Sequence, residues 1–139
     1  MEHIAYCDAK EKELQSLLDG TKTMLIRGAA GRKLPHGRVN EGEVIYLLEN
    51  AGSATVRARA VVSFAWFSEK LTPEASSQIV KEHIAPLKLS AAQVKRWAGK
   101  RYLCLIGLAD VRVIEPFAFL RTKSMDDWIC IPSIKDVMA

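Results

Sequence analysis

The hydrophobic positions of this chain switch between helical and strand spacing several times. Leucines recur at helical spacing in the run ELQSLL, and we predict a helix over residues 8–18. Asp8 and Glu11 form a capping-box pattern at its start, and Gly20 ends it as a C′ residue. Short apolar runs predict strands over residues 23–27, 44–48, 55–67, 101–115 and 129–131.

The strand over residues 55–67 carries the clearest pattern. Val56, Ala58 and Ala60 alternate with Arg57 and Arg59. Successive side chains of a strand point to opposite faces, so this alternation predicts a strand with one buried face and one solvated face.

Two further helices are predicted between this strand and the next. The first begins at the Thr72-Pro73 start signal and stops before Pro86. The second begins at Ser90, which forms a capping box with Gln93, and ends at Gly99.

This order of elements predicts an α+β fold. A short chain with many strands favours a small barrel, because a closed sheet leaves no edge strand with unpaired backbone hydrogen-bonding groups. The chain has 139 residues, 49% of them apolar, and we expect a single domain over residues 1–139. No apolar run approaches the ~20 residues of a membrane helix, and the charged N-terminus lacks a signal-peptide pattern. We therefore expect a cytoplasmic protein that does not enter a membrane.

The three cysteines are Cys7, Cys104 and Cys130, and they lie far apart in the sequence. Their spacing matches no zinc motif, and we expect neither a metal nor a cofactor. Cys104 lies in an apolar run and is expected to be a buried thiol. None of the three lies in an evident basic pocket, so the sequence does not favour a cysteine nucleophile.

Charge is concentrated in the segment GTKTMLIRGAAGRKLPHGRVN, residues 20–40. It holds five basic side chains and one histidine but no acid, in a chain whose net charge is only +4. Glycine lets a backbone approach a ligand closely and Lys or Arg supply charge, so the segment suits an anion. The alternative is a solvated surface loop, with the histidine in water rather than on an anion or a base. The candidate ligand-binding residues are Lys22, Arg27, Arg32, Lys33, His36 and Arg38.

A second basic cluster spans residues 95–102 and includes two aromatic residues, Trp97 and Tyr102. Bases stack on rings while cations meet phosphates, so this composition suits single-stranded nucleic acid. The alternative, which we favour for Trp97, is that its ring faces the core. The aspartates at 126–127 could pair with the basic loop while Trp128 fills the barrel.

The stretch Gly20–Arg27 resembles the G-x-K-x-x-E-x-R signature of the ASCH domains, a branch of the PUA-like superfamily. The run EGEVIY at 41–46 is similar to a strand start of the same family. The resemblance implies a small PUA-like β-barrel with an N-terminal helix and two helices inserted between strands. It also implies a cleft in which Lys22 and Arg27 face RNA or a nucleotide-like anion, with the basic loop lying over it.

The sequence departs from the signature at Leu25, which stands where the family has glutamate. Some ASCH members hydrolyse acylated cytidine with the signature lysine, a threonine at this position and a glutamate farther along. Leucine cannot supply a nucleophile or exchange a proton, so that chemistry is not inherited unchanged. An alternative function remains a small hydrolase of modified nucleosides, in which Lys22 works with Glu49 or His36. A third is a protein-interaction domain without a small ligand.

Overall fold

The computed structural model describes residues 1–52, 54–120 and 126–138, and its centre is one curled sheet. The sheet has six strands in the order β2-β5-β4-β3-β1-β6. All neighbours are antiparallel except β1 and β3, which are parallel. The strands are β1 (Glu2–Cys7), β2 (Met24–Ala29), β3 (Val44–Glu49), β4 (Thr55–Phe67), β5 (Tyr102–Ala118) and β6 (Trp128–Ile131).

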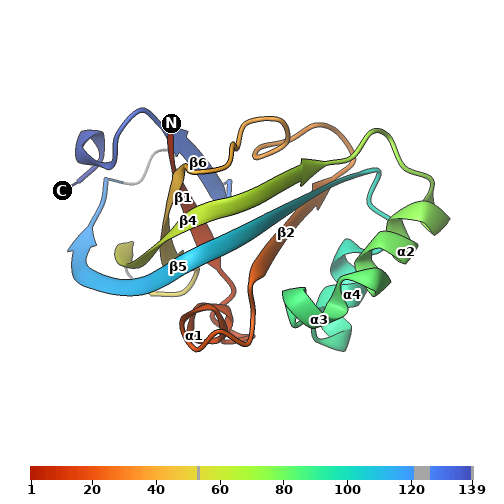
Figure 1. The fold of residues 1–139 in the computed structure, drawn as a ribbon, viewed down its shortest axis with the longest axis horizontal. Coiled ribbons are helices and arrows are strands. Elements are labelled where there is room, and N and C mark those ends of the chain that lie inside the picture. The colour runs from red at the N-terminus through yellow and green to blue at the C-terminus, as the bar shows by residue number, and fades with distance from the viewer. Residues whose placement is uncertain (53, 121–125, 139) are drawn as a thin grey trace.

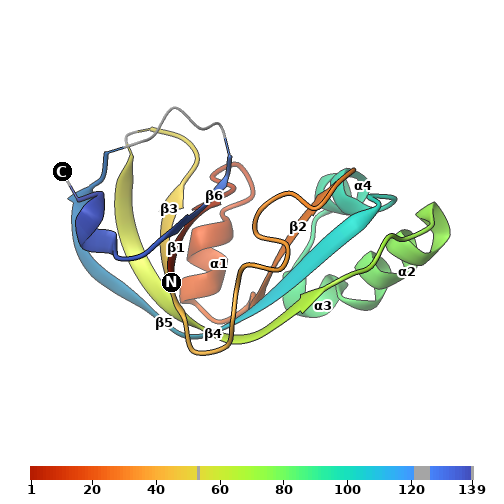
Figure 2. The same cartoon turned by 90° about the horizontal axis from the view of Figure 1, so that it is seen from above.

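The sheet bends around helix α1 (Glu13–Leu18), as Figure 2 shows from above. Its two edges are β2 and β6, so among the described residues the curl stays open as a half-barrel. The α+β class and the barrel-like sheet predicted from the sequence are therefore confirmed.

Three helices join β4 to β5 and gather at one end of these two long strands (Figure 1). They are α2 (Pro73–Glu82), α3 (Ile84–Leu87) and α4 (Ala91–Trp97). The predicted caps are present: the Thr72 hydroxyl accepts the Ala75 N–H at 3.2 Å, and both halves of the Ser90 capping box form. The predicted end before Pro86 is confirmed, since α2 ends at Glu82. Pro86 lies in the first turn of the short helix α3, which was not predicted and where its missing N–H needs no partner.

Helix α1 is shorter than the predicted helix over residues 8–18. Asp8 accepts the N–H groups of Lys10 and Glu11 at 3.0 and 3.3 Å, which closes a turn ahead of the helix. Lys12 then adopts a left-handed backbone with φ of 53°, and α1 starts at Glu13. The predicted capping role of Asp8 thus belongs to this turn.

Strand β1 was not predicted. It pairs in parallel with β3 and antiparallel with β6, and Ile4, Ala5 and Cys7 are fully buried. The residues that pair with it lie about 40 and 125 positions away in the sequence, so no local sequence pattern predicts this strand.

The concave face of the sheet holds the main core. The predicted alternation in β4 is confirmed, since Val56, Ala58 and Ala60 are completely buried while Arg57 is exposed. Trp128 is also completely buried in this core, so it fills the half-barrel as expected.

The pairing of β5 with β4 is irregular. The register of β5 with β4 shifts around Gly107 and Asp110, and Asp110 has φ of 53°. A Cβ on Gly107 would lie 2.3 Å from the Phe64 ring. Glycine therefore allows Phe64 to pack this closely against the β5 backbone.

Helices α2–α4 cover the other face of β2 and β5. Val80, Leu87 and Trp97 pack there against apolar side chains of both strands. Trp97 is 7% exposed, which confirms that its ring faces the core. No helix within the described ranges is both long enough and apolar enough to cross a membrane.

Candidate functional site

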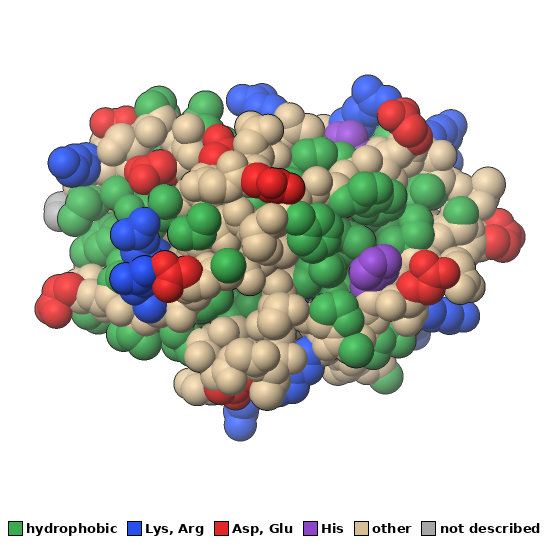
Figure 3. Space-filling model, viewed as in Figure 1, with side chains coloured by type: hydrophobic (Ala, Val, Ile, Leu, Met, Phe, Trp, Pro, Cys, Tyr) green, Lys and Arg blue, Asp and Glu red, His purple; other side chains and the backbone are tan. Residues whose placement is uncertain are grey.

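A hollow of about 240 Å³ lies where the loop over residues 28–40 meets the end of α4 and the start of β5. We call it the basic hollow. Two segments more than 60 residues apart in the sequence supply its cations, which the sequence had shown only as separate clusters. In Figure 3, Lys and Arg side chains gather at the upper right, beyond the end of β4. The lining residues that bear charge or a polar ring are Arg27, Lys33, His36, Arg96, Lys100, Tyr102 and Asp127.

Arg27 forms one wall of the basic hollow and is itself 6% exposed. Its guanidinium donates to the carbonyl oxygens of Ile26 and Tyr6, both at 2.7 Å. Its Nε lies 3.1 Å from the Asp127 carboxylate, and its Cζ lies 5.7 Å from the Trp128 ring centroid. Arg27 therefore ties β2 to β1 and to the start of β6, and part of its charge is neutralised.

The basic loop is held by acidic residues on two sides. Lys33 lies 3.3 Å from the Asp126 carboxylate, and Arg32 lies 3.3 Å from that of Glu69. With the Arg27–Asp127 pair, this confirms that the aspartates at 126–127 pair with the basic segment. Arg32 also stacks over Tyr102, with its Cζ 5.6 Å from the ring centroid.

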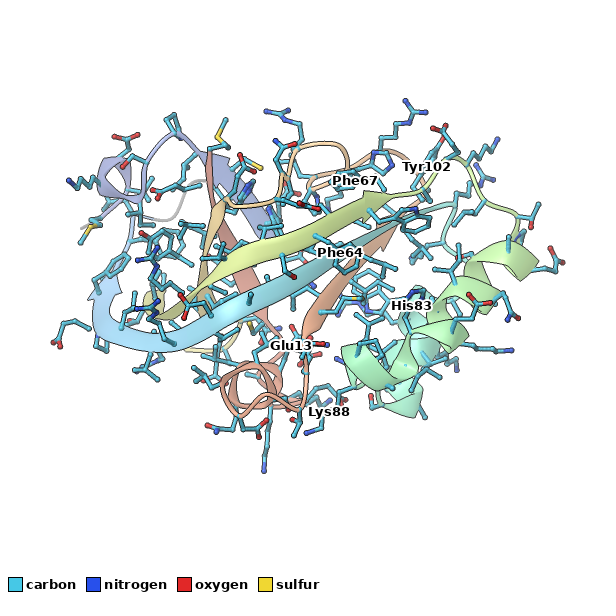
Figure 4. All side chains as sticks on the ribbon, in the orientation of Figure 1. Glu13, Phe64, Phe67, His83, Lys88 and Tyr102 are labelled. Carbon is cyan, nitrogen blue, oxygen red and sulfur yellow. The ribbon has the colours of Figure 1, made fainter. Side chains whose placement is uncertain are left out.

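His36 anchors the loop to the sheet. Its Nε2 donates to the Ser68 carbonyl oxygen at 2.8 Å, and its ring centroid lies 5.4 Å from Phe67 and 5.6 Å from Tyr102. Phe67 and Tyr102, labelled in Figure 4, are the last residue of β4 and the first residue of β5. The ring of His36 is thus packed rather than in water, and it lines the basic hollow with its remaining edge.

Arg96 and Lys100 are exposed cations of the basic hollow, as is Lys33. Within the part of the chain that the structure describes, neither Arg96 nor Lys100 has a carboxylate within salt-bridge distance. Arg96 lies over the Trp97 ring, with its Cζ 4.6 Å from the centroid. Their charges are therefore available to an anion. Neither was among the six candidate ligand-binding residues, although both lie in the second basic cluster over residues 95–102.

Lys22 lies apart from the basic hollow. It is 3% exposed, donates from Nζ to the Leu87 carbonyl oxygen, and lies 3.4 Å from the Glu13 carboxylate. Burial lowers the pKa of Lys22, and the charge of Glu13 opposes this shift. A second hollow of about 450 Å³ is lined by Lys22, Glu13 and Lys88. Figure 4 labels Glu13 and Lys88, which carry opposite charges.

The basic hollow and the second hollow have no lining residue in common. A third hollow of about 80 Å³ shares Arg27 with the basic hollow and Glu13 with the second hollow. None of these three hollows is lined by both Lys22 and Arg27, so the structure does not place the two residues on one cleft floor.

The other sequence-based candidates lie elsewhere. Glu49 lines a separate hollow with Arg57, so the carboxylate beside Lys22 is that of Glu13. Sequence reasoning missed Glu13 because a helical glutamate carries no local mark of burial. Arg38 is exposed and lines none of the hollows described here. Leu25 is completely buried, so the signature position that departs from the family faces the core.

An apolar hollow of about 440 Å³ lies on the helix-bearing face, between β4 and α2. Phe64 and His83 line it and lie near each other in Figure 4. His83 donates from Nδ1 to the Ile79 carbonyl oxygen at 2.7 Å. This hollow lacks the cations of the basic hollow, so it is not a candidate for an anion.

The thiol that lines the basic hollow is that of Cys104. Cys104 is 3% exposed, and burial raises its pKa to about 12, so the thiol is protonated at neutral pH. This confirms the expected buried thiol. Within the described ranges, no three or more His, Cys, Asp or Glu side chains are grouped so as to hold a metal ion.

Comparison with known proteins identifies the fold. No protein-family model matches the chain, and no curated protein sequence matches it. The crystal structure of an ASCH protein from Zymomonas mobilis superposes with a TM-score of 0.63 at 15% identity, covering 84% of this chain and 73% of that one.

Two single-residue variants of the same Zymomonas mobilis protein match similarly. One has a TM-score of 0.62 at 15% identity over 84% of this chain and 75% of its own. The other has a TM-score of 0.63 at 13% identity over 84% and 73%. The chain therefore has the ASCH fold, as its signature segment and its curled sheet both indicated.

Proposed function

We propose that the protein binds single-stranded RNA, or a nucleotide-like anion, in the basic hollow. The observation that carries the proposal is the meeting of the 28–40 loop with Arg96 and Lys100 around one hollow. Among the described residues these two exposed cations have no carboxylate partner, so they can neutralise phosphate groups without first breaking an ion pair.

The Tyr102 ring in the lining of the hollow favours a nucleotide as the ligand rather than a simple anion. Tyr102 is partly exposed, lines the hollow, and is already stacked on one side by Arg32. A base can stack on such a ring while its phosphate meets Arg96 or Lys100, which is how sequence-tolerant single-strand binding is built.

The test is titration of a fluorescently labelled single-stranded RNA of about 8 nucleotides. The protein binds it at low salt, and the Arg96→Ala/Lys100→Ala double variant weakens binding about tenfold. The same variant reduces the slope of log affinity against log salt by about 1.4, because each lost phosphate contact removes about 0.7.

The matched control is Lys95→Ala/Arg101→Ala. It removes the same charge from neighbouring exposed positions that do not line the hollow. If both double variants weaken binding equally, net charge and not the hollow holds the RNA. If the unaltered protein binds no RNA at low salt, the proposal is wrong.

A second candidate function, a small hydrolase of modified nucleosides, rests on the Lys22–Glu13 pair. A buried lysine whose pKa is lowered, 3.4 Å from a carboxylate and beside a hollow, is a suitable acid–base pair. The test incubates the protein with a panel of acylated and alkylated nucleosides and measures hydrolysis. If this function is correct, at least one of them is hydrolysed, and Glu13→Gln abolishes the turnover. Absence of turnover across the panel refutes it.

A further inference from the structure

Among the described residues, Asp127 is the acidic side chain that lines the basic hollow. It directly precedes β6, and its carboxylate lies in the lining beside Arg27. A carboxylate repels phosphate groups, so it opposes the attraction that Arg96 and Lys100 provide. The position of Asp127 therefore suggests contact with a part of the ligand other than phosphate.

Asp127 is held at two points. Its backbone carbonyl oxygen accepts the Tyr6 N–H at 2.9 Å, which fixes the residue against β1. Its Oδ2 lies 3.1 Å from the Nε of Arg27, and the Arg27 guanidinium is itself held by two backbone carbonyl oxygens. The Asp127 side chain is still 39% exposed. The carboxylate is therefore positioned in advance and remains open to a ligand.

The ion pair also separates two parts of the basic hollow. Arg27 is engaged by Asp127 and by carbonyl oxygens, so its charge is largely satisfied within the protein. Arg96 and Lys100, at the end of α4 and just beyond it, carry charge that is available to phosphate. We therefore expect the phosphate to lie towards α4, which leaves the wall of Arg27 and Asp127 to the base.

A carboxylate only accepts hydrogen bonds, so it distinguishes bases by the donors on their Watson–Crick edges. Guanine presents two adjacent, parallel N–H donors at N1 and N2, which match a carboxylate as the fork of an arginine does. Cytosine and adenine each present an amino group beside a ring nitrogen that accepts. Uracil presents one N–H between two carbonyl oxygens. A carboxylate acceptor is therefore satisfied best by guanine.

Contact with Arg27 does not prevent this pairing. Each carboxylate oxygen has two lone pairs, so Oδ2 of Asp127 can accept from a base while it faces Arg27. Among the described residues, no ion pair involves Oδ1 of Asp127. Both oxygens can therefore accept from the two donors of one base.

We propose that the basic hollow is selective for guanine, and that the Asp127 carboxylate accepts hydrogen bonds from its N1–H and N2–H. Arg96 and Lys100 hold the adjoining phosphate, and Arg27 is a positioning residue that orients the carboxylate. This inference rests on the proposed RNA-binding function of the hollow and adds the identity of the base.

The test compares four labelled single-stranded RNAs of about 8 nucleotides that differ at one central position. That position holds guanosine, inosine, adenosine or uridine, and every other position holds uridine. The guanosine strand binds about tenfold more tightly than the adenosine and uridine strands. Inosine lacks the N2 amino group, so its strand binds about threefold more weakly than the guanosine strand. Adenosine controls for the greater stacking area of a purine.

The variant Asp127→Asn separates base contact from a purely electrostatic role. Loss of a negative charge strengthens the binding of every strand alike, because all four carry the same phosphates. Loss of the second acceptor lowers the ratio of guanosine to adenosine affinity from about tenfold to about one. The matched control is Asp136→Asn, the same change at an exposed position that lines none of the hollows described above, and it leaves this ratio unchanged.

The outcomes distinguish this inference from RNA binding itself. If the unaltered protein binds all four strands equally, selectivity for guanine is overturned while RNA binding stands. A folded Asp127→Asn variant that keeps the preference also overturns it, and circular dichroism establishes the folding. If no strand binds at low salt, the proposed function fails and the inference fails with it. Should Asp127→Asn not fold, the comparison of guanosine with inosine in the unaltered protein decides.

Discussion

The buried Lys22–Glu13 pair gives the sharpest stability prediction. The Lys22 Nζ and Glu13 carboxylate lie 3.4 Å apart, and their side chains are 3% and 8% exposed. Glu13→Gln leaves the ammonium buried beside a neutral amide, and removing one partner of a buried pair costs about 3–5 kcal/mol. The Leu87 carbonyl still accepts from Lys22, so we expect a value near the lower limit, about 3 kcal/mol.

A double-mutant cycle measured by urea unfolding tests this reasoning. Lys22→Met keeps a similar length without charge, and among the described residues it leaves the Glu13 carboxylate with the Asp8 N–H, at 3.3 Å, as its remaining partner. The double variant removes both charges, so it is less destabilised than the sum of the singles by about 2 kcal/mol. Additivity within about 0.3 kcal/mol would show that the two groups do not stabilise each other.

The same pair makes stability depend on pH. The pKa of Lys22 is lowered in the folded protein from 10.5, so between the two values the unfolded chain holds a proton that the folded chain has released. Stability therefore rises with pH through that window, and below the folded value the contribution is constant. Burial raises the pKa of Cys7 and Cys104, which gives the opposite slope in the same region.

The difference between the unaltered protein and Lys22→Met isolates the lysine, because both proteins keep the same thiols. The unfolding free energy of the unaltered protein minus that of the variant increases as pH rises from neutrality towards 10.5. A difference that stays flat over this range would contradict the assigned burial of the lysine charge.

Three further predictions concern packing and local structure. Gly107→Ala places a Cβ 2.3 Å from the Phe64 ring and lowers the unfolding free energy by about 1–3 kcal/mol in denaturant titrations. Ser90→Ala removes one half of the α4 capping box and costs about 1 kcal/mol, seen as a lower melting temperature. Arg27→Lys cannot reproduce the fork to two carbonyl oxygens at 2.7 Å, so it lowers the melting temperature more than Arg57→Lys at an exposed position.

Features that depend on neighbouring residues in the sequence were predictable. The Thr72 and Ser90 caps involve groups three residues apart, so the sequence alone contains both partners. The alternation in β4 was equally visible, because a strand with one buried face repeats every two residues. The signature segment and its spacing to the next strand indicated the ASCH fold.

Features that depend on distant partners were not predictable in the same way. Strand β1 has polar residues at Glu2 and His3 and is recognisable only beside β3 and β6. Glu13 and Lys22 are nine positions apart, yet their pairing depends on α1 being held inside the curl of the sheet.

By itself, then, the sequence determined the fold class, the starts of α2 and α4, and the presence of two basic segments. Only the tertiary structure decided that Arg96 and Lys100 share a hollow with the 28–40 loop while Lys22 faces Glu13 in another. It alone brought Asp127 into the lining of the basic hollow beside Arg27. The physical reason is that helix caps and strand alternation are local, whereas sheet order sets which distant side chains meet.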